Sequence, residues 1–137
     1  MHVEFIATVA VIAADPDASR RLFVDALGLP LRSQSGGDYV WTDKLEGAKH
    51  FAVWPLSQAA EACFGDSEWP ADRPVPQVSI EFELADVESV RAGCDELEAA
   101  GHSLLHPPRE EPWGQTVARL LSSDGAIVGI CFTPSMH

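Results

Sequence analysis

The chain has 137 residues, the length of one ordinary domain, and 46% of them are hydrophobic, which is typical of a globular protein. Its 21 acidic residues outnumber 9 basic ones, for a formal charge of −12. This acidity argues against nucleic acid or an anionic membrane as a partner, because both require positive charge. The cysteines lie far apart and form no C-x-x-C pair, so we expect buried free thiols in a cytoplasmic protein.

The first half of the chain predicts a strand, a helix and two further strands. Residues 5–13 are apolar and largely β-branched, which predicts a buried strand too short to span a bilayer. Asp15 and the proline after it predict the start of a helix, and Gly28 predicts its end. The segments GGDYVWTD and KHFAVWP predict two strands, and a short helix is expected over about 56–64.

The second half repeats this order after a break. Residues 65–77 hold three prolines and predict a linker. Apolar and polar residues alternate over 78–84, which predicts a strand with one apolar face. Asp86 predicts the cap of a helix whose apolar residues recur between 87 and 97, and Gly101 predicts its end.

The closing stretch EPWGQTVARLLSSDGAIVGICF, residues 111–132, predicts two strands joined by a tight turn at Ser123-Asp124-Gly125. Gly129 lies inside the second of these strands. A glycine there weakens the strand and often marks a place that another group approaches closely.

The two halves match at a constant offset of 71, for example Asp15 with Asp86. We therefore expect an α+β fold with two βαβββ modules in tandem within a single domain, residues 1–137. Module one covers about 1–64, the linker about 65–77 and module two about 78–137. Each module uses one sheet face for its helix, which leaves the other face free to curve around a cavity.

Three stretches resemble the vicinal oxygen chelate superfamily of glyoxalases, bleomycin resistance proteins and extradiol dioxygenases. They are DPDASRRLFVDALGLPL, VSIEFELADVESVRAGCDELEAAGH and PWGQTVARLLSSDGAIVGI, and the last resembles the family's usual WG…R…DPDGN…E hairpin. The resemblance covers nearly the whole chain. It implies that the modules form a curved, incomplete barrel around a cavity, and that the protein is a homodimer. It also implies where enzymes of this family hold a divalent metal, with His, Gln or Glu on the first strand of each module and Glu on the last.

The resemblance places three of these four ligand positions on residues that bind metals poorly or not at all. Seven residues before each capping aspartate lie Thr8 and Ser79, and four residues after the turn glycine lies Gly129. The fourth position falls around His50 to Ala52. Hydroxyls are poor ligands for transition metals and glycine offers none, so we expect no tightly bound metal and no cofactor.

Two residues could still carry acid–base chemistry. Glu81 shares a strand face with Ser79, and its carboxylate could act as a general base, stay solvated, or pair with an arginine such as Arg119. His50 lies in a predicted strand and could be a remnant ligand, a proton shuttle or a structural residue. His102 and His106 follow the second helix in a loop-like stretch, and we expect them on the surface.

Other side chains are candidates for binding a ligand. Trp41, Trp54 and Trp113 could line the cavity or serve ordinary packing. Gln115 could orient a polar ligand group. Arg119 could bind an anion if its strand face lines the cavity, or pair with surface acids if it does not.

These features favour a metal-free protein that binds a small molecule. The alternatives are a metal-dependent glyoxalase-type lyase or dioxygenase with displaced ligands such as His50 and Glu81, and a metal-free acid–base enzyme using either residue. A scaffold or regulatory protein with a degenerate cavity is the remaining hypothesis. The expected partners are a small-molecule ligand and a second copy of the chain.

Overall fold

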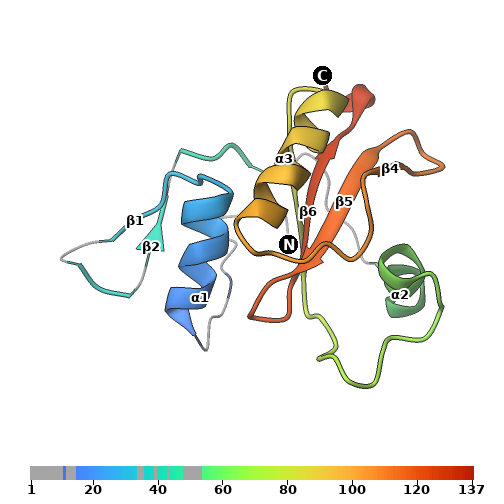
Figure 1. Ribbon diagram of the computed structural model, residues 1–137, viewed down its shortest axis with the longest axis horizontal. Coiled ribbons are helices and arrows are strands. Elements are labelled where there is room, and N and C mark those ends of the chain that lie inside the picture. Colours follow the sequence, from blue (N-terminus) through green and yellow to red (C-terminus); the bar gives the residue numbers. More distant parts are fainter. Residues whose placement is uncertain (1–10, 12–14, 34–35, 39, 43, 48–53) are drawn as a thin grey trace, which may run out of the picture.

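A computed structural model describes residues 11, 15–33, 36–38, 40–42, 44–47 and 54–137. These residues form the expected α+β fold, with a four-stranded and a two-stranded sheet that are not closed into a barrel (Figure 1). The described elements, in chain order, are α1 (Pro16–Arg20), η1 (Arg21–Ala26), β1 (Arg32–Ser33), β2 (Val40–Trp41), α2 (Leu56–Phe64), β3 (Ser79–Glu83), α3 (Val87–Ala99), β4 (Arg109–Glu110), β5 (Thr116–Leu121), β6 (Ile127–Phe132) and η2 (Pro134–Met136). Apart from Val11, the predicted strand over residues 5–13 lies outside the described residues, as does most of KHFAVWP.

The first helix begins where the sequence predicts. The carboxylate of Asp15 accepts a hydrogen bond of 3.0 Å from the backbone N–H of Ala18, which satisfies one of the free donors of the first turn. The helix continues from α1 into the π-helical turn η1, which buries Leu22 and Phe23. It ends before Gly28, whose φ of +65° lies in the left-handed region that favours glycine.

The second half has the order β3–α3–β4–β5–β6, as the second βαβββ module predicts. In space the sheet order is β3-β6-β5-β4, with β3 parallel to β6 and the other pairs antiparallel. Asp86 caps α3 by accepting a hydrogen bond from the backbone N–H of Ser89 at 2.7 Å. The module boundaries themselves stay a prediction, although residues 65–77 contain no helix or strand.

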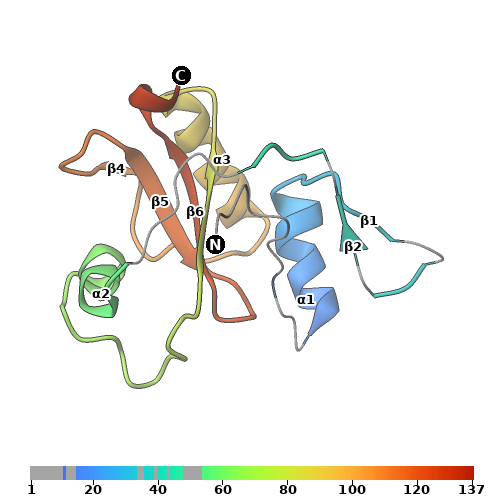
Figure 2. The same ribbon diagram turned by 180° about the vertical axis from the view of Figure 1, so that it is seen from behind.

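The two faces of the four-stranded sheet differ in character. Helix α3 covers one face, where its residues Val90, Cys94 and Leu97 pack in one buried cluster with Leu120, Val128 and Ile130. Residues at the alternating positions of β5 and β6 therefore point to the opposite face. Helix α2 covers only one end of that second face, through contacts of Cys63 and Ala59 with Ile127 (Figures 1 and 2).

All three cysteines are buried and free, as expected. Burial raises the pKa of the Cys63 and Cys94 thiols to about 11 and that of Cys131 to about 12. These thiols stay protonated at neutral pH and are poor nucleophiles. No helix in the described part of the chain is long and apolar enough to cross a membrane.

Candidate functional site

The candidate site lies on the sheet face opposite to α3. Three residues line up there across neighbouring strands, because Gly129 of β6 is in register with Glu81 of β3 on one side and with Arg119 of β5 on the other. The carboxylate of Glu81 and the guanidinium of Arg119 therefore lie on either side of Gly129. They can approach each other because the glycine has no side chain between them.

Gly129 leaves the space that the side chain of Glu81 fills. A Cβ atom added at position 129 would lie 2.9 Å from Cγ and 3.4 Å from Oε1 of Glu81. It would also lie 3.4 Å from Cγ2 of Val117. The backbone of Gly129 does not have a positive φ, so the reason for a glycine here is steric.

Arg119 is the centre of the cluster, and only 1% of its side chain is exposed. Its Nε donates to Oε1 of Glu81 at 3.3 Å, and its Nη1 donates to Oε1 of Glu111 at 2.8 Å. Its Cζ lies 5.4 Å from the ring centroid of Trp54, within the range of a cation–π contact. Of the alternatives for Glu81, the structure shows the pairing with Arg119, whose charge is thus neutralised by carboxylates of the chain itself.

His106 lies against the same guanidinium, with Nε2 at 3.5 Å from Nη1 of Arg119. The Nδ1 atom lies 2.8 Å from the carbonyl oxygen of Pro107. A carbonyl can only accept, so Nδ1 carries the proton and the lone pair of Nε2 points to Arg119. Burial lowers the pKa of His106, and the charges of Arg109 and Arg119 lower it further against the opposing effect of the hydrogen bond with Pro107. The imidazole is neutral at pH 7.

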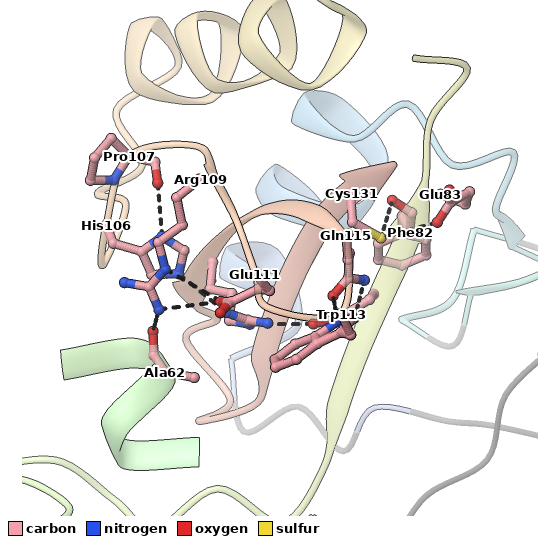
Figure 3. A network of polar contacts seen from close by, with 12 residues as sticks. Ala62, Phe82, Glu83, His106, Pro107, Arg109, Glu111, Trp113, Gln115 and Cys131 are labelled. Carbon is pink, nitrogen blue, oxygen red and sulfur yellow. Dashed lines mark hydrogen bonds and ion pairs between the residues drawn. The ribbon is translucent and has the colours of Figure 1, made fainter. Parts of the chain in front are cut away.

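The prediction that His106 lies on the surface is wrong, because only 8% of the residue is exposed. Figure 3 shows His106, Arg109 and Glu111 close together, with Ala62 of α2 beside Arg109. Arg109 joins the two elements, since it contacts Oε1 of Glu111 at 3.3 Å and donates to the carbonyl of Ala62 in α2. The proline pair after His106 correctly predicts a loop. It does not predict that this loop packs against the sheet and buries His106.

Glu111 is 9% exposed at its side chain. Burial alone would raise the pKa of this carboxyl group. The hydrogen bond and charge of Arg119, with those of Arg109, outweigh burial and lower the pKa below its ordinary value. Glu111 is therefore ionised at neutral pH.

A chain of hydrogen bonds links the cluster to an exposed tryptophan. Nε2 of Gln115 donates to Oε2 of Glu81 at 2.9 Å, and Oε1 of Gln115 accepts from the indole N–H of Trp113 at 3.0 Å. Gln115 is buried, whereas 61% of Trp113 is exposed. Figure 3 shows the indole beside Gln115 at the edge of the cluster. The exposed indole of Trp113 and the partly exposed carboxylate of Glu81 are therefore linked through one buried side chain, that of Gln115.

The structure brings together Glu81, Trp54, Trp113, Gln115, Arg119 and Gly129 of the predicted site residues. Ser79 is exposed at the start of β3 and pairs with Ile127. Trp41 lies in β2, where the guanidinium of Arg32 sits 4.2 Å from its ring, and this small sheet lies on the other side of α1 (Figure 1). Thr8 and His50 lie outside the described residues.

Three members of the cluster are missing from the prediction, namely Arg109, Glu111 and His106. Glu111 lies in the short segment 111–115 that leads from β4 into β5, the strand that carries Arg119, and this closeness in sequence was the one signal available. A backbone hydrogen bond of 2.8 Å from the N–H of Glu111 to the carbonyl of Gln115 turns the chain back at this point. This turn places the carboxylate over the neighbouring strand.

A groove of about 490 Å³ lies elsewhere, at the end of the sheet between η1 and the end of α3. Among its lining residues are Leu22, Gly101 and Leu121. No member of the Arg119 cluster lines it, so the cluster and this groove are separate features.

The described residues do not fit a divalent metal. Ser79 and Gly129, two of the positions implied by the resemblance, offer a hydroxyl and no side chain. The carboxylates of Glu81 and Glu111 are bound to a guanidinium. Among the described residues, no three His, Cys, Asp or Glu side chains are arranged to hold a metal ion.

Comparison with known families gives one match along nearly the full chain. The family model described as Glyoxalase/Bleomycin resistance protein/Dioxygenase superfamily matches residues 5–136. The chain belongs to this superfamily. This confirms the family that the three sequence stretches resemble, and the superfamily's curved-sheet fold accounts for the observed sheet. No curated protein gives a significant match.

Several solved structures share the fold. A glyoxalase-related enzyme from Fulvimarina pelagi is 23% identical, with a TM-score of 0.56 over 94% of this chain and 90% of that one. A glyoxalase/bleomycin resistance protein/dioxygenase from Nocardioides is 20% identical, with a TM-score of 0.54 over 93% and 85%. A protein of unknown function from Agrobacterium tumefaciens str. C58 is 22% identical, with a TM-score of 0.60 over 97% of both chains. At these identities the likeness concerns the fold alone.

Gly129→Ala tests the steric role of the glycine. We expect it to lower the free energy of unfolding by about 1–3 kcal/mol, because the new methyl group meets Cγ of Glu81. In a Glu81→Ala background the same substitution should cost less, by at least about 0.5 kcal/mol, because Cγ is gone. Urea denaturation of the four proteins in this cycle gives the coupling. An equal cost in both backgrounds would refute the steric explanation.

Glu111→Gln tests the buried ion pair. Since the folded-state pKa of Glu111 is lowered, its ionisation stabilises the protein above the pKa of the unfolded chain, and this stabilisation is lost as pH falls through the folded-state pKa. The variant should lose about 1–2 kcal/mol at pH 7 and progressively less below about pH 4.5. Glu110→Gln, at the exposed neighbouring position, is the matched control. A pH-independent difference would contradict this account.

Proposed function

We propose that this protein is a metal-free, small-molecule-binding member of the superfamily, with its ligand on the sheet face that carries the Arg119 cluster. The observation that carries the proposal is the exposed indole of Trp113, linked through Gln115 to the partly exposed carboxylate of Glu81. Aromatic surface beside a few fixed polar groups is the usual composition of a ligand site.

The roles within this site follow from exposure. Trp113 offers a face on which a planar or apolar ligand group can stack. Glu81 is 28% exposed at its side chain and can accept a hydrogen bond from a ligand donor. Gln115 and Arg119 are buried and hold that carboxylate in place from two sides. They are positioning residues in this proposal.

The hydrogen bonds of Glu81 favour binding over acid–base catalysis. Both of its carboxylate oxygens already accept, one from Arg119 and one from Gln115. A general base must direct an oxygen at the proton that it removes, whereas both oxygens of Glu81 are directed at donors of the chain itself. A glyoxalase-type lyase or dioxygenase would need metal ligands other than the described residues of this cluster, such as His50.

Three further properties belong to this proposal. The protein is a homodimer by analogy with the superfamily, which a mass measurement in solution decides. It is cytoplasmic, in keeping with its three buried free thiols. It folds as one domain of two modules, with boundaries at about 64 and 78.

Metal content is the decisive first measurement. Untagged protein is incubated with Zn²⁺, Ni²⁺, Mn²⁺ or Fe²⁺, desalted, and analysed by mass spectrometry. We expect well under one equivalent of each metal, because the cluster already contains its own cation. Close to one equivalent of any of them would overturn the proposal and make a lyase or dioxygenase the leading hypothesis.

Ligand binding is measured by ligand-observed NMR with a library of small aromatic compounds, with metal-free bleomycin included as a probe. Compounds that bind at the site should lose about tenfold in affinity in Trp113→Ala, which corresponds to about 1.4 kcal/mol. Trp41→Ala is the matched control and should bind normally, since Trp41 lies in the other sheet. If every binding compound is insensitive to Trp113→Ala, the ligand site lies elsewhere.

A further inference from the structure

The groups around the Arg119 guanidinium are those that bind divalent cations. Oε1 of Glu81 lies 3.3 Å from Nε, while Oε1 of Glu111 and Nε2 of His106 lie 2.8 and 3.5 Å from Nη1. Carboxylate oxygens and neutral imidazole nitrogens are common protein ligands of zinc and related metals. Here all three direct lone pairs at an organic cation.

His106 is oriented as a cation ligand. Its Nδ1–H donates to the carbonyl of Pro107, and this bond fixes the direction of the bare Nε2. Metal-binding histidines are held by the same device, in which the second ring nitrogen donates to a carbonyl or carboxylate. The bond thus selects the tautomer that presents a lone pair to Arg119.

The buried carboxylate of Glu111 requires a positive charge beside it. Glu111 is 9% exposed, and burying its charge without a partner would be strongly unfavourable. Arg119 supplies the positive charge from a side chain that is 1% exposed. The ring of Trp54 lies 5.4 Å from Cζ and adds a further contact that favours a cation.

We infer that Arg119 is the resident cation of this sheet face, and that its guanidinium fills the place in which Glu81, Glu111 and His106 would otherwise hold a divalent metal ion. This inference rests on the metal-free character of the proposed function and gives its cause. The three groups in this inference differ from Thr8, Ser79 and Gly129, the residues at the ligand positions that the family resemblance implies. The missing family ligands are one reason for the absence of metal, and the built-in guanidinium is a second, independent one.

The size of the guanidinium explains why these three groups do not share a metal in the native chain. Zinc–oxygen and zinc–nitrogen bonds are about 2.0–2.2 Å long, so metal ligands must converge on one point. Glu81 and Glu111 instead bind different nitrogen atoms of Arg119. Removing the guanidinium leaves space into which both flexible carboxylates can turn.

Zinc binding to untagged Arg119→Ser, Arg119→Lys and the native protein tests the inference, with a chromogenic zinc indicator as competitor. The serine variant should gain one equivalent of zinc, with affinity at least about tenfold higher than the native protein. The lysine variant keeps a cation and should behave like the native protein. The double variant Arg119→Ser/Glu111→Gln should lose the gained site, which distinguishes it from adventitious binding by other histidines.

Thermal unfolding covers the case in which the serine variant folds poorly. Zinc in large excess over its dissociation constant should raise the Tm of Arg119→Ser by several degrees and leave the native Tm unchanged. If the variant is unfolded without metal, refolding in zinc should restore the native circular dichroism.

Two outcomes would overturn this inference alone. One is a folded Arg119→Ser variant that binds zinc no better than a metal-free native protein, and the other is a variant that stays unfolded with zinc. One equivalent of zinc on the native protein would instead overturn the proposed function and this inference together. The failures of the two proposals are therefore distinguishable.

Discussion

The buried guanidinium of Arg119 is the constraint on which the candidate site depends. A charge that is 1% exposed persists in a folded protein only with charged and hydrogen-bonded partners around it. Here the partners come from β3, from the segment before β5 and from the loop after α3. One residue therefore ties together parts of the chain that are distant in sequence. Arg119 is paired with the carboxylates of Glu81 and Glu111, and the side chain of Glu81 reaches it across the space left free at Gly129.

Successive side chains of a strand point to opposite faces of the sheet, so apolar and polar residues are separated between the two faces. On β5 and β6, Ala118, Leu120, Val128 and Ile130 face α3 and form an apolar core. The intervening positions include Arg119 and Gly129, so a one-residue shift in register would bury the guanidinium in that core. The apolar core thus fixes the register of the strands, and the register in turn fixes the polar cluster. The apolar core and the polar cluster therefore lie on opposite faces of one sheet.

Local signals predicted the fold well, whereas the site depends on contacts distant in sequence. Asp15 and Asp86 act as helix caps, because a cap needs only the next three residues. The alternation over 78–84 likewise places Glu81 correctly, and pairing with Arg119 was one of its expected alternatives. The burial of His106 and Glu111 could not be predicted from local sequence, because it depends on how the chain after α3 packs against the sheet. The π-helical turn that continues α1 also has no signal in the sequence.

Gly129 lies at a position of interest in both the sequence and the structure. The family resemblance implies a metal-binding glutamate at this position, and the chain has a glycine there. In the structure it is the position whose side-chain space is taken by Glu81 from the neighbouring strand. Any side chain at 129 would begin with a Cβ atom 2.9 Å from Cγ of Glu81, so the side chain of Glu81 would have to shift. The chain carries a carboxylate on β3 instead, where Glu81 forms an ion pair with Arg119.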